Sequence, residues 1–185
     1  MIDWKAYQKS KINAAVRTWL VDFLKGKKIE TAIDLGCGPG NETVYMAKKG
    51  IKVLAIDKEL DNSIILSRLN KKEQKNVTFL KGLFEEVELP KTDLVAALFS
   101  LPFCDADKFM ELWDKIYKSL NRKGYLLCQL FGKNDFRKDY KDVITLSKNE
   151  IGKLLERYDI KKVDEIFSDV EGNHKHFYNI VAQKK

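Results

Sequence analysis

The chain has few of the residues that mark disulfide-rich, metal-binding or membrane proteins. Its 185 residues include only three cysteines, three prolines and two histidines. The cysteines stand singly, without a C-x-x-C pair, which argues against a disulfide framework or zinc cluster and favours reduced thiols in the cytoplasm. No apolar run approaches the roughly twenty residues that cross a bilayer. The opening MIDWKAYQKS has no apolar core, so we also expect no secretory leader.

What is present is the composition of a globular protein with a basic surface. Hydrophobic residues make up 44% and charged residues 33%, and the length suits a single domain over residues 1–185. The net charge of +7 could attract nucleic acid. The lysines are spread along the chain without a long basic run, which favours a solvated lysine-rich surface and leaves nucleic acid as an alternative partner. The sequence does not indicate an oligomeric state.

Short apolar runs alternate with helical segments along most of the chain. The expected strands span 31–35, 52–56, 77–80, 94–99 and 125–130, and the expected helices span 7–24, 41–49, 60–70, 108–120 and 148–157. The strands lack polar alternation, which is typical of a parallel sheet with helices on both faces. Because crossovers between parallel strands are right-handed, we expect a doubly wound α/β sheet.

The end of the chain departs from this alternation. Two β-like segments, 163–167 and 177–182, are separated only by SDVEGNHKH. That connection is shorter than the dozen or so residues of a crossover, so the two segments must pair as an antiparallel hairpin. The predicted fold is therefore a mostly parallel, seven-stranded sheet that ends in an antiparallel hairpin.

A glycine-rich segment, AIDLGCGPGNET, follows the first expected strand. Its glycines, Gly36, Gly38 and Gly40, allow the backbone to turn tightly and to approach a ligand closely. A tight turn alone would need one glycine. The spacing G-x-G-x-G differs from the G-x-G-x-x-G of nicotinamide-binding loops. Asp34 would repel a pyrophosphate and instead suits a ligand with an ammonium and a sulfonium charge.

This segment resembles the first motif of class I S-adenosylmethionine-dependent methyltransferases, acidic-x-G-x-G-x-G. The resemblance implies that the loop wraps the methionine end of S-adenosylmethionine and that the acidic residue orients it. The residues in these positions are Asp34, Gly36, Cys37, Gly38 and Gly40. We expect the segment 1–25 to cover the cofactor, with Tyr7 or Arg17 near its carboxylate; a position on a solvent face is the alternative for both.

Further cofactor contacts are expected after the second, third and fourth strands. Asp57 ends the second strand, where a carboxylate can bind both ribose hydroxyls; a helix-capping role is the alternative. Lys58 could lie over the adenine. The family often has an acidic residue after the third strand, but this chain has Leu83, so the backbone N–H of Leu83 or Phe84 would serve the adenine instead. We also assign Phe99 to the cofactor site.

The methyl acceptor would lie outside the carboxyl ends of the strands. Asp135, His174 and His176 are the candidates for a catalytic base there; a helix cap or an ordinary loop or edge-strand residue is the alternative for each. Two histidines are too few for a metal site, so we expect none. Ser100-Leu101-Pro102-Phe103 lacks the paired prolines of enzymes that methylate amino groups of DNA.

The segments LPFC, QLFGKNDF and HFYNIVAQKK resemble small bacterial methyltransferases related to the tellurite-resistance type. This resemblance implies a small-molecule acceptor without naming it. The hypothesis is a methyltransferase that acts on a thiol, a metalloid, an oxygen or a nitrogen. The alternatives are an RNA methyltransferase and a non-catalytic or nicotinamide-binding Rossmann-type domain.

Overall fold

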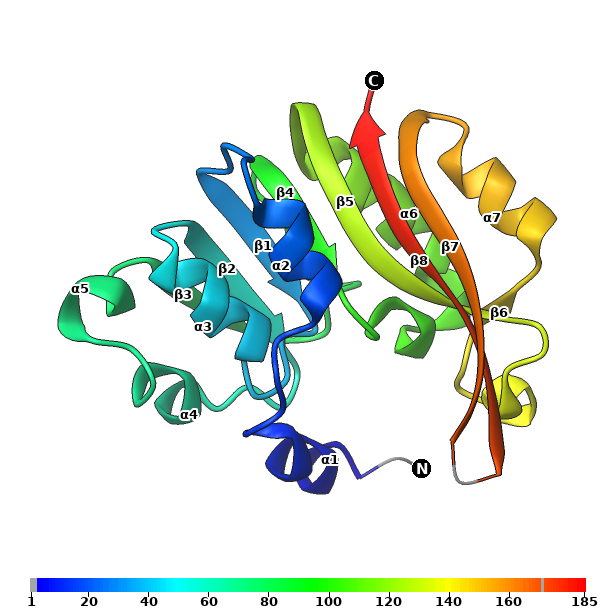
Figure 1. Cartoon of the computed structure of the whole chain (residues 1–185), viewed down its shortest axis with the longest axis horizontal. Coiled ribbons are helices and arrows are strands. Elements are labelled where there is room, and N and C mark those ends of the chain that lie inside the picture. The colour runs from blue at the N-terminus through cyan, green and yellow to red at the C-terminus, as the bar shows by residue number, and fades with distance from the viewer. Residues whose placement is uncertain (1–2, 171) are drawn as a thin grey trace. The chain divides into compact units, whose positions relative to one another are not determined.

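A computed structural model describes residues 3–170 and 172–185 of the chain (Figure 1). The contacts between residues divide it into two compact units, one reaching to Val87 and the other covering Glu88–Lys185. The first two residues of the segment expected to cover the cofactor lie outside the described residues, as does Glu171 in the expected hairpin connection. A single domain over 1–185 stays a prediction.

The amino-terminal unit is built on three parallel strands in the order β3-β2-β1. Its elements are α1 (Trp4–Lys11), α2 (Thr18–Leu24), β1 (Thr31–Leu35), α3 (Asn41–Lys48), β2 (Lys52–Asp57), α4 (Asn62–Leu66), α5 (Lys71–Gln74) and β3 (Val77–Lys81). Figure 1 shows α3 lying against this part of the sheet. A buried apolar cluster joins the helices to the strands and includes Val44, Ala55 and Ile65. The expected strands and the helix after the glycine loop are confirmed.

Two expected helices of this unit differ from the prediction. The segment predicted as one helix over 7–24 forms α1 and α2. It is divided because polar groups at the end of α1 and before α2 interact with residues of α3. Asn41 Nδ2 donates to the carbonyl of Lys11 at the end of α1 (2.8 Å), and Arg17, which precedes α2, pairs with Glu42. The helix predicted over 60–70 is shorter than expected and forms α4 alone. Helix α5, which was not predicted, begins after Asn70, which caps it through a capping box.

The carboxyl-terminal unit has four principal strands in the order β4-β5-β8-β7. Its elements are β4 (Thr92–Ala97), the 3-10 turns η1 (Leu101–Phe103) and η2 (Ala106–Lys108), α6 (Phe109–Ser119), β5 (Leu120–Gly132), η3 (Phe136–Asp139), β6 (Thr145–Leu146), α7 (Lys148–Leu155), β7 (Tyr158–Val170) and β8 (Asn173–Lys184). Strand β4 is parallel to β5, while β8 is antiparallel to both β5 and β7.

The predicted terminal hairpin is confirmed, but its strands are much longer than expected. Residues assigned to its connection pair across the hairpin, with Phe167 opposite His176 and Asp169 opposite His174. The start of β8 lies at the carboxyl end of β5, because Phe177 pairs with Phe131. The mostly parallel, doubly wound sheet with an antiparallel hairpin is thus confirmed, with eight strands instead of seven. The eighth, β6, has two residues, too few to form a sequence pattern.

Candidate functional site

The glycine loop adopts a backbone that needs its glycines. Gly36, Gly38 and Gly40 have φ values of 76°, 53° and 76°, in the left-handed region that costs other residues free energy. The amides of Gly36 and Cys37 donate to the carbonyl of Ile56 at 2.8 and 3.0 Å, which holds the loop against the end of β2. Burial raises the pKa of the Cys37 thiol well above its usual range, and nearby carboxylates add to this. These effects favour the neutral thiol form of Cys37.

Asp57 is tied directly to this loop. Its Oδ2 accepts a hydrogen bond from the Gly38 amide at 2.8 Å. Its Oδ1 accepts from the Glu59 amide at 2.8 Å and from Gln8 Nε2 at 3.1 Å. Both Asp57 and Gln8 are buried. The glycine loop and the carboxylate at the end of β2, predicted separately, thus form one polar site, and α1 contributes to it.

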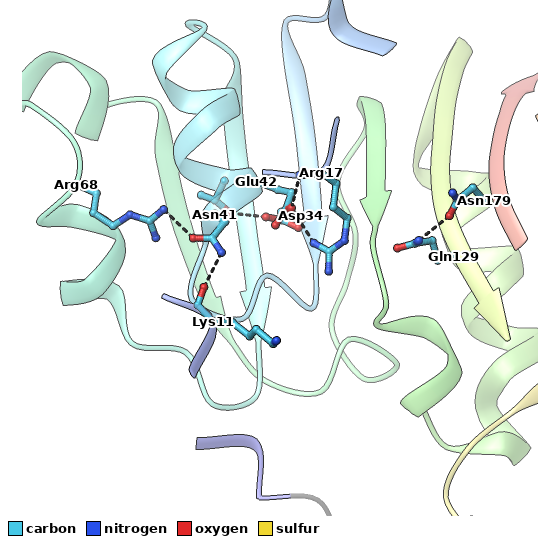
Figure 2. A network of polar contacts seen from close by, with 9 residues as sticks. Lys11, Arg17, Asp34, Asn41, Glu42, Arg68, Gln129 and Asn179 are labelled. Carbon is cyan, nitrogen blue, oxygen red and sulfur yellow. Dashed lines mark hydrogen bonds and ion pairs between the residues drawn. The ribbon is translucent and has the colours of Figure 1, made fainter. Parts of the chain in front are cut away.

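Asp34 lies beside the loop in a buried polar network. Its side chain is buried, and Thr43 Oγ1 donates to its Oδ2 at 2.5 Å. Burial raises the pKa of Asp34 to about 7, and the nearby Glu42 carboxylate raises it further, against the hydrogen bond from Thr43 and the charge of Arg17. Arg17 Nη1 pairs with Glu42 Oε1 at 2.7 Å (Figure 2). Arg17, expected near the cofactor carboxylate, therefore has a protein partner.

Asn41 connects three segments around the glycine loop. Its Nδ2 donates to the Lys11 carbonyl at 2.8 Å, and its Oδ1 accepts from Arg68 Nη2 at 2.8 Å (Figure 2). Arg68 also donates to the Pro39 carbonyl at 2.9 Å. The end of α1, the loop and the segment after α4 are thereby held together.

The residues that we assign to the adenine end of the cofactor lie in different surroundings. Lys58 Nζ lies over the Trp4 ring, 5.1 Å from its centroid. Leu83 is exposed and Phe84 half-buried. Within the part of the chain that the structure describes, neither Leu83 nor Phe84 donates a backbone hydrogen bond, so both amides remain available to a ligand, as the hypothesis requires.

Phe99, in the carboxyl-terminal unit, has an unusual backbone. Its φ of 58° is left-handed, which is strained for a bulky residue and is typical of functional positions. Its ring lies 5.4 Å from that of Phe177 and 6.1 Å from that of Phe131. The next residue, Ser100, has a buried hydroxyl with no hydrogen-bond partner among the described residues.

Asp135 is buried in a set of protein contacts. Arg137 donates to it from Nε at 2.7 Å, from Nη2 at 2.9 Å and from its amide at 3.0 Å. The His176 amide adds a fourth bond at 3.0 Å. Burial alone would raise the pKa of Asp135, but these hydrogen bonds hold it below its usual value. Such a carboxylate is a weak base, and it caps η3, which was the alternative reading of its role.

The two histidines lie on one face of β8 but in different surroundings. His176 is buried, and its Nδ1 accepts from the Asn134 amide at 3.2 Å. Its Nε2 therefore carries the proton and donates to Glu165 Oε1 at 3.0 Å. Both ring nitrogens of His176 are thus engaged. His174 is exposed and pairs with Asp169.

Several residues of the amino-terminal site were not predicted. They are Gln8, Asn41, Glu42, Thr43 and Arg68. Three of them directly follow the glycine loop, so their position in the segment GNET could have indicated that they belong to the site. Nothing in the sequence marked Gln8, which is 49 residues from its partner Asp57.

Residues 3–170 and 172–185 contain no group of three or more histidine, cysteine, aspartate or glutamate side chains arranged to hold a metal ion. Within the same residues, no helix has the length and apolar character needed to cross a bilayer.

Comparison with known sequences identifies a family. The family described as "Methyltransferase domain" matches residues 32–124, which include the glycine loop and Asp57. A curated relative, carboxy-S-adenosyl-L-methionine synthase from Campylobacter jejuni, is 27% identical over 169 residues, covering 72% of this chain and 70% of its own.

Solved structures share the fold at low sequence identity. TehB from Haemophilus influenzae aligns with a TM-score of 0.77 and 19% identity, covering 97% of this chain. This chain spans 66% of TehB, slightly less than two thirds. A Burkholderia thailandensis 1,6-didemethyltoxoflavin-N1-methyltransferase, solved with bound 1,6-didemethyltoxoflavin and S-adenosylhomocysteine, aligns with a TM-score of 0.69 and 17% identity, covering 91% of this chain and 76% of its own.

Proposed function

This chain belongs to the class I S-adenosylmethionine-dependent methyltransferases, and we propose that it transfers the methyl group of that cofactor to a small-molecule acceptor. The observation that carries the proposal is the bond between the Gly38 amide and Asp57, which joins the glycine loop to the carboxylate at the end of β2. This pairing supports the proposal because a carboxylate at the end of β2 can bind ribose hydroxyls while the adjacent loop wraps an amino-acid chain.

We assign the cofactor contacts residue by residue. Asp57 would accept hydrogen bonds from the ribose hydroxyls, and the loop Gly36–Gly40 would surround the methionine part. Asp34, when ionised, would orient the cofactor's ammonium group. The amides of Leu83 and Phe84, which make no hydrogen bond within the described residues, would serve the adenine.

The cofactor supplies a methyl group already activated by a sulfonium centre. The protein's part is to align an acceptor with that group and exclude water, a contribution of up to about 7–11 kcal/mol. Asp135 and both ring nitrogens of His176 are engaged by protein partners, and the exposed His174 pairs with Asp169. We therefore favour an acceptor that is nucleophilic at neutral pH without a base, such as a thiolate or a reduced metalloid, over an alcohol.

The first experiment is calorimetry with S-adenosylhomocysteine and, separately, NAD. We expect the wild type to bind S-adenosylhomocysteine and not NAD, and Asp57→Ala to lose that binding. Wild-type protein that fails to bind S-adenosylhomocysteine, or Asp57→Ala with full affinity, would overturn the proposal. Transfer of a labelled methyl group can then be screened across thiols, reduced metalloids, amines, alcohols and bulk RNA.

The curated relatives favour a second candidate, in which the cofactor itself is modified. They are carboxy-S-adenosyl-L-methionine synthases, at 27% identity over 72% of this chain. Mass spectrometry of the nucleoside products separates the two candidates. Methyl transfer yields S-adenosylhomocysteine, whereas the second activity yields S-adenosylmethionine bearing an added carboxyl group. An RNA methyltransferase is supported only by the net charge of +7 and would show RNA binding that weakens steeply with salt.

A further inference from the structure

Gln8 contacts the carboxylate that the proposed function gives to the ribose. A carboxylate offers about four lone-pair positions. Two of the positions of Asp57, both on Oδ1, are filled by Gln8 Nε2 and by the Glu59 amide. A third position, on Oδ2, is filled by the Gly38 amide. A ribose diol brings two O–H donors where one position remains, so one of the present donors has to leave before both hydroxyls can bind.

The two backbone donors are fixed in place. The Gly38 amide belongs to a loop that the Gly36 and Cys37 amides tie to the Ile56 carbonyl at 2.8 and 3.0 Å. The Glu59 amide follows Asp57 by two residues in the same turn. Gln8 is the one side-chain donor of the three, and it comes from α1, 49 residues away in sequence.

The helix that carries Gln8 is held by mostly polar contacts. Gln8 is the one buried residue of α1. The pair Lys5–Glu59 spans 3.9 Å between side chains that are 78% and 31% exposed, an arrangement that contributes little. Segments with few buried apolar contacts open at low free energy. The Gln8–Asp57 bond is therefore a principal anchor of α1.

Space for the displaced amide lies next to it. A cavity of about 620 Å³ is lined by Lys5, Gln8 and Lys9 of α1 together with residues such as Leu60 and Phe79. When Gln8 leaves Asp57, its side chain can turn into this cavity.

We propose that the Gln8 amide and the ribose diol of the cofactor compete for Asp57. Gln8 thus acts as an internal competitor, which satisfies a buried carboxylate when no nucleoside is bound and gives it up when one binds. This inference rests on the proposed role of Asp57 and adds a residue that sets the cofactor affinity of the same site.

The test is calorimetry with S-adenosylhomocysteine on Gln8→Met, which keeps the length of the side chain and removes its donor. Without the competitor, binding is expected to tighten about ten-fold, or ~1.4 kcal/mol. Gln8→Ala is expected to behave in the same way. Lys9→Met is the matched control, because Lys9 lines the same cavity but donates no hydrogen bond to Asp57 among the described residues. Its affinity is expected to stay unchanged.

The outcomes separate this inference from the function on which it rests. Weaker or unchanged binding in Gln8→Met would overturn the competition while leaving the proposed function intact, provided the wild type binds and Asp57→Asn does not. A wild type that does not bind would overturn both.

Discussion

At the scale of single residues, one buried carboxyl links stability to pH. The pKa of Asp34 is raised to about 7 by burial and by the Glu42 charge. The folded state therefore binds this proton more tightly than the unfolded chain, whose aspartates titrate near 3.9. The resulting stabilisation is fully present below pH 4 and is lost as the pH rises through about 7.

The expected consequence is a free energy of unfolding that falls with rising pH between about 4 and 7, by up to ~1.4 kcal/mol per unit from this group. Asp34→Asn should flatten that slope, as measured by urea unfolding at several pH values. Asp61→Asn is the control: hydrogen bonds from Ser63 lower the pKa of Asp61, so its titration lies below this range. An unchanged slope in Asp34→Asn would contradict the raised pKa.

Two glycines allow backbone strain to be separated from steric overlap. Gly40 and Gly26 have similar φ values, 76° and 69°. A Cβ at Gly40 would overlap the side chain of Ile65, whereas one at Gly26 would meet nothing within 4 Å. Gly26→Ala should cost about 1 kcal/mol, and Gly40→Ala about 1–3 kcal/mol more. Urea unfolding of both variants measures the difference, and equal costs would show that Ile65 moves aside.

At the scale of elements, Asp135 ties η3 to β8. It caps η3, accepts a bidentate pair from Arg137 and accepts the His176 amide. Asp135→Ala leaves these donors unpaired and should destabilise the protein by about 3 kcal/mol. Asp139→Ala is the control, since Asp139 is exposed in the same turn and should change stability by less than about 0.5 kcal/mol. An Asp135→Ala variant that is stable but inactive would restore the catalytic hypothesis.

The terminal hairpin illustrates what periodicity can and cannot predict about an element. The short connection was enough to predict antiparallel pairing. The length of the strands was not predictable, because they continue through polar residues such as Asp169 and His174, whose pairing comes from the opposite strand and not from their own hydrophobicity. The division of the first helix has a similar cause, since Asn41 donates a hydrogen bond to the carbonyl at the end of α1.

At the scale of the whole molecule, the sheet and the cofactor loop were predictable because their signals are local. The glycines directly follow β1, Asp34 lies near the end of β1 and Asp57 ends β2. The carboxyl ends of parallel strands meet at one edge of the sheet. Gln8 was not predictable, because its contact joins a polar helix to a carboxylate 49 residues away. The three hydrogen bonds to Asp57 could likewise not be predicted from the sequence, although they determine how many further donors the carboxylate can bind.

The prediction of one domain can be tested through the tryptophans. Trp4 and Trp19 belong to the amino-terminal unit, and Trp113 belongs to the unit that covers Glu88–Lys185. In a protein carrying Trp4→Phe and Trp19→Phe, fluorescence reports the carboxyl-terminal unit alone. S-adenosylhomocysteine at one hundred times its Kd stabilises the bound state by about 2.7 kcal/mol.

If the chain unfolds as one domain, this stabilisation should raise the melting temperature reported by Trp113 by roughly 5–11 °C, although the assigned ribose and methionine contacts belong to the other unit. The matched control adds Asp57→Ala to the same protein, which should remove the shift. A shift seen by circular dichroism but not by Trp113 fluorescence would mean that the two units unfold separately, because linkage to a ligand extends only as far as cooperative unfolding does.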